Sequence, residues 1–275
     1  DVSAAFDASA EGETGAAAVD AAVDVDAIAT ALDAAVDTAV DARVDATPVD
    51  ATMVMDVGAD VAQYDAGPGS LGMGLVAFYP FDEASGTNAG DGSGNGQTAT
   101  MNGATFAPGQ RGNAATLDGT NQYVSLPTGI VSSLTQCSIS FWVNLVVSSA
   151  RGHIFDWGTG NTAYMSISNN QFAISVGGIN AEERIHMPSL PTGIWRHVVV
   201  TLAGSVGTIY VNGVQAGQNA AMTLTPSSLG MTTRNWLGRS QDPTDLYLTG
   251  QIDEFRIYRR ALTPAEVQQL FQLRL

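Results

Sequence analysis

The stretch that most constrains the fold lies near the end of the chain, over residues 250–270, GQIDEFRIYRRALTPAEVQQL. Its first half alternates with a period of two, a pattern that predicts a β-strand. One face of that strand would carry Ile252, Glu254, Arg256 and Tyr258, and the other face the residues between them.

A helix signal follows the strand directly. Thr263 can serve as the N-cap, Pro264 occupies the first helical position, and Glu266 stands three residues after the cap, so a capping box is available. Leu262 before the cap and Val267 after the first turn can form a hydrophobic staple. A long strand closed by one short helix predicts an all-β domain whose last strand lies in the interior of a sheet.

Short strand-like segments recur along the rest of the chain. Asn212-Gly213 is the strongest hairpin signal, because a type I′ turn needs both central residues at positive φ. Many short strands with turns between them indicate two packed antiparallel sheets. The predicted strands cover residues 76–81, 114–118, 122–126, 138–145, 153–157, 163–168, 171–176, 195–202 and 208–211.

Seven segments occur in an order that resembles the laminin-G-like, concanavalin A-like lectin/glucanase jelly-roll family of bacterial secreted proteins. They read LVAFYPFDEASGT, GDGSGNG, LDGTNQYVSLP, SISFWVNL, GIWRHVVVTL, TIYVNGVQ and the terminal stretch above. The resemblance runs from about residue 75 to the end of the chain. It implies a two-sheet antiparallel jelly-roll sandwich with one short C-terminal helix. It is less specific about function, because the fold hosts lectins, adhesion modules, spacers and glycosidases.

Charge divides the chain near residue 70. Residues 1–70 hold 15 of the 27 acidic residues and one basic residue, Arg43. They contain almost no large apolar side chain, so they cannot offset the entropy of ordering. We predict a disordered acidic Asp/Ala/Val-rich linker over residues 1–70, before a jelly-roll domain over residues 71–275. An acidic strip that collects divalent cations is the alternative interpretation of the leader.

Composition also bounds the partners. The chain has no lysine, which argues against nucleic acid and anionic membrane as partners. No apolar run reaches eighteen residues, so membrane insertion is not expected. The single cysteine, Cys137, begins an apolar alternation and is expected to be buried. The chain starts at Asp1 without Met or an apolar signal segment, and we expect a processed protein that is secreted or attached to a bacterial cell surface.

Calcium is the cofactor that the resemblance favours. In this family the chain ends are neighbours, so residues 76–81 should pair with residues 252–258 and bring Asp82 beside Asp253. Asp91 and Asp118 lie in Gly-rich turns and could complete a shell of oxygen ligands, which Ca²⁺ prefers. The alternative is that Asp82 and Asp118 cap turns.

Catalysis is not expected. Glycosidases of this fold present acids that alternate along one strand, so that they share a face. The acidic pairs here, Glu182-Glu183 and Asp253-Glu254, are adjacent in sequence, and neighbours on a strand point to opposite faces. No G-x-S-x-G or H-E-x-x-H motif occurs either.

Histidine and aromatic residues single out no ligand-binding residue. The three histidines are scattered and are expected to be packed or solvated: His153, His186 and His197. Trp142 and Trp195 are expected in the core. The aromatic residues nearer turns could stack on sugar rings, with Arg184 or Arg234 as hydrogen-bonding partners: Trp157, Trp236, Tyr164 and Tyr247.

The favoured function is therefore non-catalytic binding, to a polysaccharide or to a surface glycoprotein. A purely structural spacer is the second hypothesis, and a glycoside hydrolase of the same fold is the third.

Overall fold

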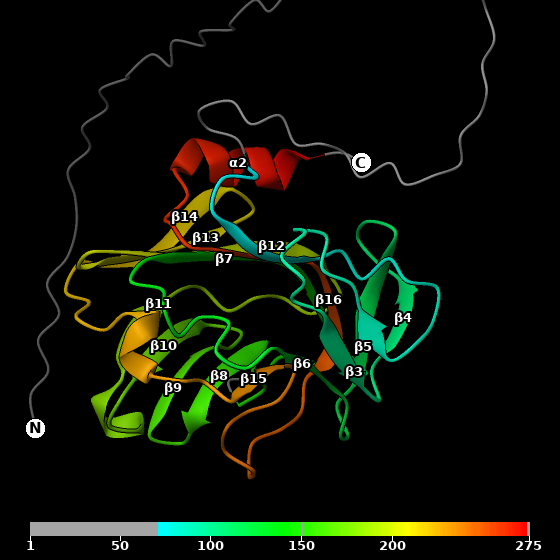
Figure 1. Ribbon diagram of the computed structural model, residues 1–275, viewed down its shortest axis with the longest axis horizontal. Coiled ribbons are helices and arrows are strands. Elements are labelled where there is room, and N and C mark those ends of the chain that lie inside the picture. The colour runs from blue at the N-terminus through cyan, green and yellow to red at the C-terminus, as the bar shows by residue number, and fades with distance from the viewer. Residues whose placement is uncertain (1–70, 150, 274–275) are drawn as a thin grey trace, which may run out of the picture. The chain divides into compact units, whose positions relative to one another are not determined.

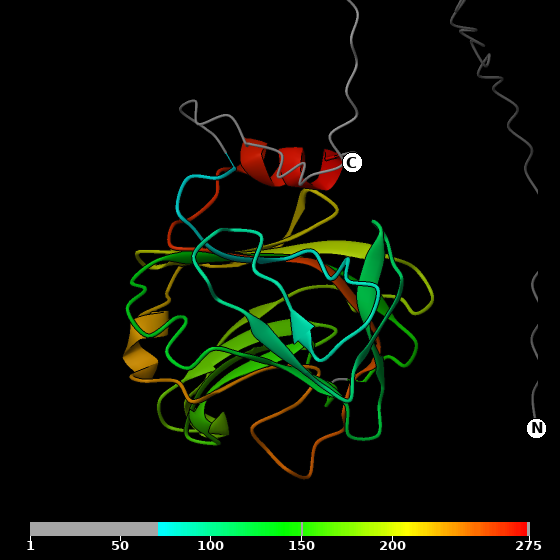
Figure 2. The same ribbon diagram turned by 45° about the vertical axis from the view of Figure 1, so that its right-hand side comes forward.

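The computed structural model describes residues 71–149 and 151–273. The predicted linker over residues 1–70 lies outside this range. The described residues form two antiparallel sheets that face each other, with one α-helix on the outer side of one of them (Figures 1 and 2). The predicted all-β jelly-roll sandwich is confirmed.

The first sheet, here called sheet A, has the order β14-β13-β12-β7-β16-β5-β4, and β1 also pairs with β16. All ladders between its strands are antiparallel. Its strands are β1 (Leu75–Tyr79), β4 (Thr105–Pro108), β5 (Asn113–Asp118), β7 (Cys137–Leu145), β12 (Arg196–Ala203), β13 (Val206–Val211), β14 (Val214–Asn219) and β16 (Thr249–Tyr258).

The second sheet, sheet B, has the order β11-β10-β9-β8-β15-β6-β3-β2. Its strands are β2 (Asn88–Ala89), β3 (Ala99–Asn102), β6 (Tyr123–Leu126), β8 (Phe155–Gly160), β9 (Ala163–Ile167), β10 (Gln171–Ser175), β11 (Glu183–His186) and β15 (Arg234–Leu237). The helices in the described part of the chain are two 3₁₀ turns, η1 (Ile179–Ala181) and η2 (Pro226–Leu229), and the α-helix α2 (Pro264–Gln272).

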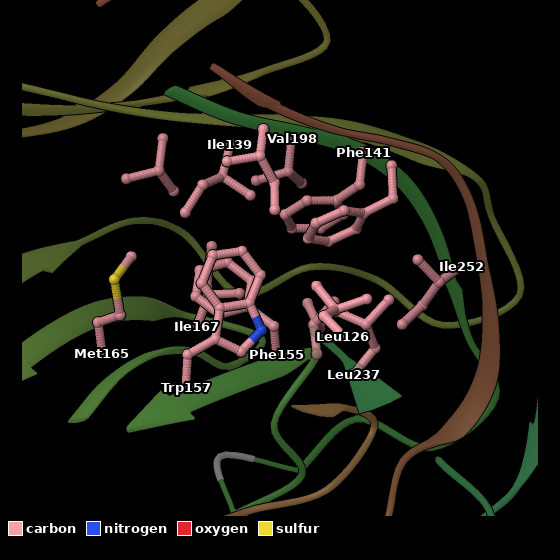
Figure 3. Close-up of a cluster of buried hydrophobic side chains, with 14 of the residues drawn as sticks. Leu126, Ile139, Phe141, Phe155, Trp157, Met165, Ile167, Val198, Leu237 and Ile252 are labelled. Atoms are coloured by element: carbon pink, nitrogen blue, oxygen red, sulfur yellow. The ribbon is translucent and has the colours of Figure 1, made fainter. Parts of the chain in front are cut away.

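Large apolar side chains fill the space between the sheets. Phe141 of sheet A packs edge-on against Phe155 of sheet B, with ring centroids 6.3 Å apart, and stacks on Phe255 at 5.5 Å. In Figure 3, Ile139 and Val198 point down from sheet A, and Trp157 and Met165 point up from sheet B. The core follows from the period of two, because alternate residues of each strand face inward.

The hairpin and the terminal strand form as the sequence predicts. Asn212 and Gly213 adopt φ of 51° and 80° between β13 and β14, as a type I′ turn requires. β16 lies inside sheet A between β7 and β5, and its second half pairs with β1 from Leu75↔Tyr258 to Tyr79↔Phe255. The predicted pairing of the two ends of the domain is confirmed.

The strict alternation predicted for β16 is wrong at one point. The ladder to β7 shifts register between Asp253 and Arg256, and Glu254 adopts a φ of 54°. This bulge inserts one extra residue, so Ile252 and Phe255 both face the core and Asp253 and Glu254 both face away from it. The two acids therefore do not point to opposite faces.

Helix α2 begins as predicted. The Thr263 hydroxyl accepts a hydrogen bond from the Glu266 amide at 3.3 Å, and the Glu266 carboxylate accepts one from the Thr263 amide at 2.8 Å. Leu262 and Val267 are buried on the outer face of sheet A, in a cluster that also contains Leu71, Val199, Tyr210, Tyr258 and Leu270. None of the helices in the described part of the chain has the length and hydropathy needed to span a membrane.

Candidate functional site

A pocket of about 500 Å³ opens on the outer face of sheet B. Its floor is formed by β8 to β11, and the loop between β15 and β16, residues 238–248, forms one wall. This loop projects from sheet B on the side away from sheet A (Figure 1). The lining is mostly polar: Arg151, His153, Asp156, Asn161, Tyr164, Ser166, Ser168, Gln171, Ile179, Glu182, Arg184, Ser240, Gln241, Asp242 and Asp245.

The strand period places these side chains. Phe155 and Trp157 of β8 lie in the core, so Asp156 between them faces outward. In β9, Met165 points into the core and Ser166 lines the pocket. The buried side chains of each strand thus fix the positions of the polar side chains that alternate with them on the outer face.

Asp156 is the most enclosed acid of the pocket, with 1% of its surface exposed. Its Oδ2 lies 3.0 Å from His153 Nδ1, accepts from the Gln241 amide at 3.0 Å, and accepts from the Ser240 hydroxyl at 3.3 Å. Burial raises the pKa of Asp156, although these hydrogen bonds oppose the shift. Burial by itself would lower the pKa of His153, but the hydrogen bond to Asp156 and the negative charges of Asp156, Asp245 and Glu182 together outweigh burial and raise that pKa.

Two acceptor atoms in this pocket are unused. Asp156 Oδ1 and Gln241 Oε1 are buried and have no hydrogen-bond partner. The side-chain nitrogen of Gln241, Nε2, is occupied, because it donates to the backbone carbonyl oxygens of Asp156 and Arg234. A buried acceptor without a partner is costly, and the two residues that carry these oxygens both line the pocket.

The other acids of the pocket are held by neighbouring groups. Glu182 accepts from the Tyr164 hydroxyl and pairs with Arg184. Asp245 pairs with Arg151 at 2.8 Å. Asp242 accepts from the amide and the hydroxyl of Thr244, and these bonds lower its pKa. Each of these acids is held by donors of this chain.

Aromatic side chains lie beside the pocket on the same face. Trp236 and Tyr123 come from β15 and β6, and their ring centroids are 6.0 Å apart. Tyr247 of the loop lies 6.4 Å from Tyr123. Arg239 covers this group, with its guanidinium carbon 4.1 Å from the Trp236 ring centroid.

The aspartates of the predicted calcium site accept hydrogen bonds from turns. Asp82 accepts from the Asn113 amide at 2.8 Å and Asp253 from the Arg111 amide at 2.9 Å, so both contact the turn between β4 and β5. Asp91 lies elsewhere and accepts from the amides of Phe78, Ser93 and Gln97. Asp118 accepts from the Thr120 amide within its own turn. Over residues 71–149 and 151–273, no group of three or more His, Cys, Asp or Glu side chains is arranged to hold a metal, and calcium stays a prediction.

The predictions for the aromatic and histidine residues need three corrections. Trp157 is fully buried in the core and cannot stack on a ligand. Trp195 is partly exposed just before β12, so it is not a core residue. His153 is not isolated, since it contacts Asp156. Trp236, Tyr164, Tyr247, Arg184 and Arg234 all lie on the pocket face, as the sequence allowed.

A family model described as "Concanavalin A-like lectin/glucanases superfamily" matches residues 118–268. The chain belongs to this superfamily. No curated protein sequence matches the chain. Among solved structures, domain 4 of AbnA, a GH43 extracellular arabinanase from Geobacillus stearothermophilus in complex with arabinotriose, is 27% identical with a TM-score of 0.62. The match covers 72% of this chain and 98% of that domain.

Two more distant structures share the fold alone. One is botulinum neurotoxin type C, whose cell entry is described as dependent on interaction with two ganglioside molecules; it is 17% identical, has a TM-score of 0.57, and the match covers 73% of this chain and 51% of that one. The other is Trypanosoma rangeli sialidase with 2,3-difluorosialic acid, at 18% identity and a TM-score of 0.54, covering 72% and 33%. The chain thus spans about half and about a third of those proteins.

Proposed function

We propose that this protein is a non-catalytic carbohydrate-binding module that holds an oligosaccharide in the pocket on the outer face of sheet B. The observation that carries the proposal is that Asp156 and Gln241, which line this pocket, each hold a buried acceptor without a partner, Asp156 Oδ1 and Gln241 Oε1. Sugar hydroxyls are donors that fit such oxygens. The pocket volume of about 500 Å³ is in the range of sites that bind small ligands.

The surroundings of the pocket support a sugar over an apolar ligand. Fixed polar groups confer orientation, and Ser166 and Gln171 add further hydrogen-bonding capacity on the floor. Trp236 and Tyr247 lie alongside the pocket, with Arg239 over both rings, and add apolar surface at its edge. The similarity to an arabinanase domain in complex with arabinotriose supports the same ligand class.

Binding without hydrolysis is supported by how the acids of the pocket are held. Glu182 and Asp245 are each paired with an arginine, so these two carboxylates are already engaged by cations of this chain. Four acids reach this pocket from separate segments of the chain, so the adjacent spacing of the acidic pairs in the sequence does not exclude catalysis. An assay for new reducing ends is therefore part of the experiment that tests the function.

A glycan array probed with the full chain tests the function. We expect binding to a set of oligosaccharides, and loss of at least tenfold in affinity for Ser166→Leu, which adds a larger side chain to the pocket floor. Ser189→Leu is the matched control, because Ser189 is exposed and does not line the pocket. Thermal melting of both variants checks that they are folded.

The outcomes separate three functions. Binding that is lost only in Ser166→Leu, without new reducing ends after incubation, supports the binding module. New reducing ends would indicate a glycoside hydrolase. The absence of any glycan binding would favour a structural spacer. We also propose that the protein is secreted or attached to a bacterial cell surface, where polysaccharides and glycoproteins are available.

A further inference from the structure

A second, smaller pocket of about 370 Å³ adjoins the first on the outer face of sheet B. The two pockets share Ser240 and Gln241, so one extended ligand can occupy both. The charges of the two linings differ. Four acids and two arginines line the larger pocket, whereas the smaller one has two arginines and no acid: Arg234, Trp236, Arg239, Ser240, Gln241 and Pro243.

Aromatic rings hold Arg239 in place. Its guanidinium carbon lies 4.1 Å from the ring centroid of Trp236, 4.7 Å from that of Tyr123 and 5.8 Å from that of Tyr247. The N–H groups of a guanidinium point outward from its edge, in its plane. A guanidinium stacked on aromatic rings can therefore still donate hydrogen bonds to an anionic oxygen. Arg234 lies over the same indole, at 6.0 Å.

Neither arginine has a carboxylate partner in the part of the chain that the structure describes. Five other arginines pair with acids there: Arg111, Arg151, Arg184, Arg256 and Arg260. Two unneutralised guanidinium groups over one indole create a local positive potential, which attracts an anionic group of a ligand.

We propose that the bound oligosaccharide is anionic, with a carboxylate or sulfate on one sugar bound by Arg234 and Arg239 in the smaller pocket and a neutral, hydroxyl-rich sugar in the larger pocket. This inference rests on the proposed function. The larger pocket has four acids against two arginines and so disfavours an anionic group relative to the smaller pocket, and the two pockets together also set the direction in which the ligand lies.

Three trisaccharides test the inference: galactotriose, trigalacturonate and a sulfated galactotriose, each titrated into the full chain at low and high salt. We expect at least one anionic form to bind about tenfold more tightly than the neutral form at low salt, with a smaller preference at high salt. Comparing trigalacturonate with the sulfated form identifies which anion is bound. Arg239→Gln should remove the preference. Arg259→Gln, which removes an exposed charge just after β16 and outside both pockets, should keep the preference.

The outcomes are distinguishable. Equal or tighter binding of galactotriose by the parent protein would overturn the anionic subsite and leave the carbohydrate-binding function standing. A preference that survives in a folded Arg239→Gln would overturn the assigned residue. Binding of none of the three, together with an array that shows no binding, would overturn both proposals. If Arg239→Gln does not fold, the salt-dependent preference of the parent protein still decides.

Discussion

The outer faces of the two sheets make opposite use of charged side chains. On sheet A, α2 and its apolar cluster cover the face, and Glu254 is fully enclosed with Arg111 at 3.3 Å and Arg256 at 2.7 Å. On sheet B, the ion pair of Arg151 with Asp245 is at the surface, and the side chain of Arg151 is 61% exposed. The same fold thus uses charges for structure on one face and leaves them accessible on the other.

Unused acceptors sharpen this contrast. Asp253 and Glu254 each have one buried oxygen without a partner, as Asp156 and Gln241 do. On sheet A these oxygens are not among the groups that line the adjoining pocket of about 1000 Å³, which is formed by Gln110, Arg111, Gly112, Trp142, Phe271, Gln272 and Leu273. On sheet B the residues that carry them, Asp156 and Gln241, line a pocket.

The largest expected effect compares one arginine from each face. Arg256→Met removes the nearer arginine partner of buried Glu254. It should lower the free energy of unfolding by about 3–5 kcal/mol, because the enclosed Glu254 carboxylate then keeps only Arg111 as a cationic partner. Arg151→Met, on the exposed pair, should change it by less than about 1 kcal/mol. Urea denaturation of both variants measures this. Equal losses would contradict the distinction between the faces.

The next effect is a pH dependence from Asp253. Burial raises the pKa of this carboxyl from 3.8 to about 7, although the Arg111 amide opposes the shift. The folded state therefore binds the Asp253 proton more tightly than the unfolded state. The resulting contribution to the free energy of unfolding is fully present below about pH 4 and is lost as the pH rises through about 7. The loss has an upper limit of about 4 kcal/mol.

Asp253→Asn should remove that loss, so its stability relative to the parent should increase between pH 4 and pH 8. Denaturation midpoints at both pH values measure the change. Asp242→Asn on the sheet B face serves as the control, because hydrogen bonds from Thr244 lower the pKa of Asp242, so this carboxyl does not titrate between pH 4 and pH 8. A parent and an Asp253→Asn variant with identical pH profiles would contradict the assignment.

Calcium provides a further comparison with the same variant. If Asp82 and Asp253 share Ca²⁺, the ion should stabilise the folded state by about 2.7 kcal/mol at a hundredfold excess over its dissociation constant, and raise the melting temperature. Asp253→Asn should abolish the rise and Asp242→Asn should keep it. All three proteins carry the same acidic leader, so its contribution cancels. Equal melting curves with calcium and with chelator would leave these aspartates as turn caps.

The smallest effect concerns the helix that covers sheet A. Thr263→Ala removes the acceptor for the Glu266 amide and should cost about 1 kcal/mol. Thr128→Ala is a suitable control, because Thr128 is exposed in the loop after β6. Denaturant midpoints give the difference. Coinciding midpoints for the two variants would show that the cap does not stabilise the helix.

Most of the fold could be predicted because its signals are local. The Asn212-Gly213 turn and the Thr263 cap each depend on neighbouring residues, and the strands follow from a simple period. The bulge in β16 could not be predicted, since Glu254 adopts a left-handed conformation that a non-glycine residue seldom takes. Because of this one extra residue, Asp253 and Glu254 point to the same side of the sheet, away from the core.

The candidate site was missed for a different reason. Asp156 contacts Ser240 and Gln241, which are 84 and 85 residues away in sequence, and no local pattern encodes that contact. One signal was present: a charged residue stands between Phe155 and Trp157 on a strand, so it had to face outward. The aromatic and arginine candidates near turns were identified in part, because turns gather at the rims of this fold.

Chemical-shift mapping tests the central claim most directly. The oligosaccharide that binds best on the array is titrated into the ¹⁵N-labelled full chain. We expect the largest amide shifts at Asp156, Ser166, Trp236 and Gln241 on sheet B, with small shifts at Trp142 and Phe271 beside α2. Shifts that concentrate around Trp142 and Phe271 would contradict the assignment of the binding face to sheet B.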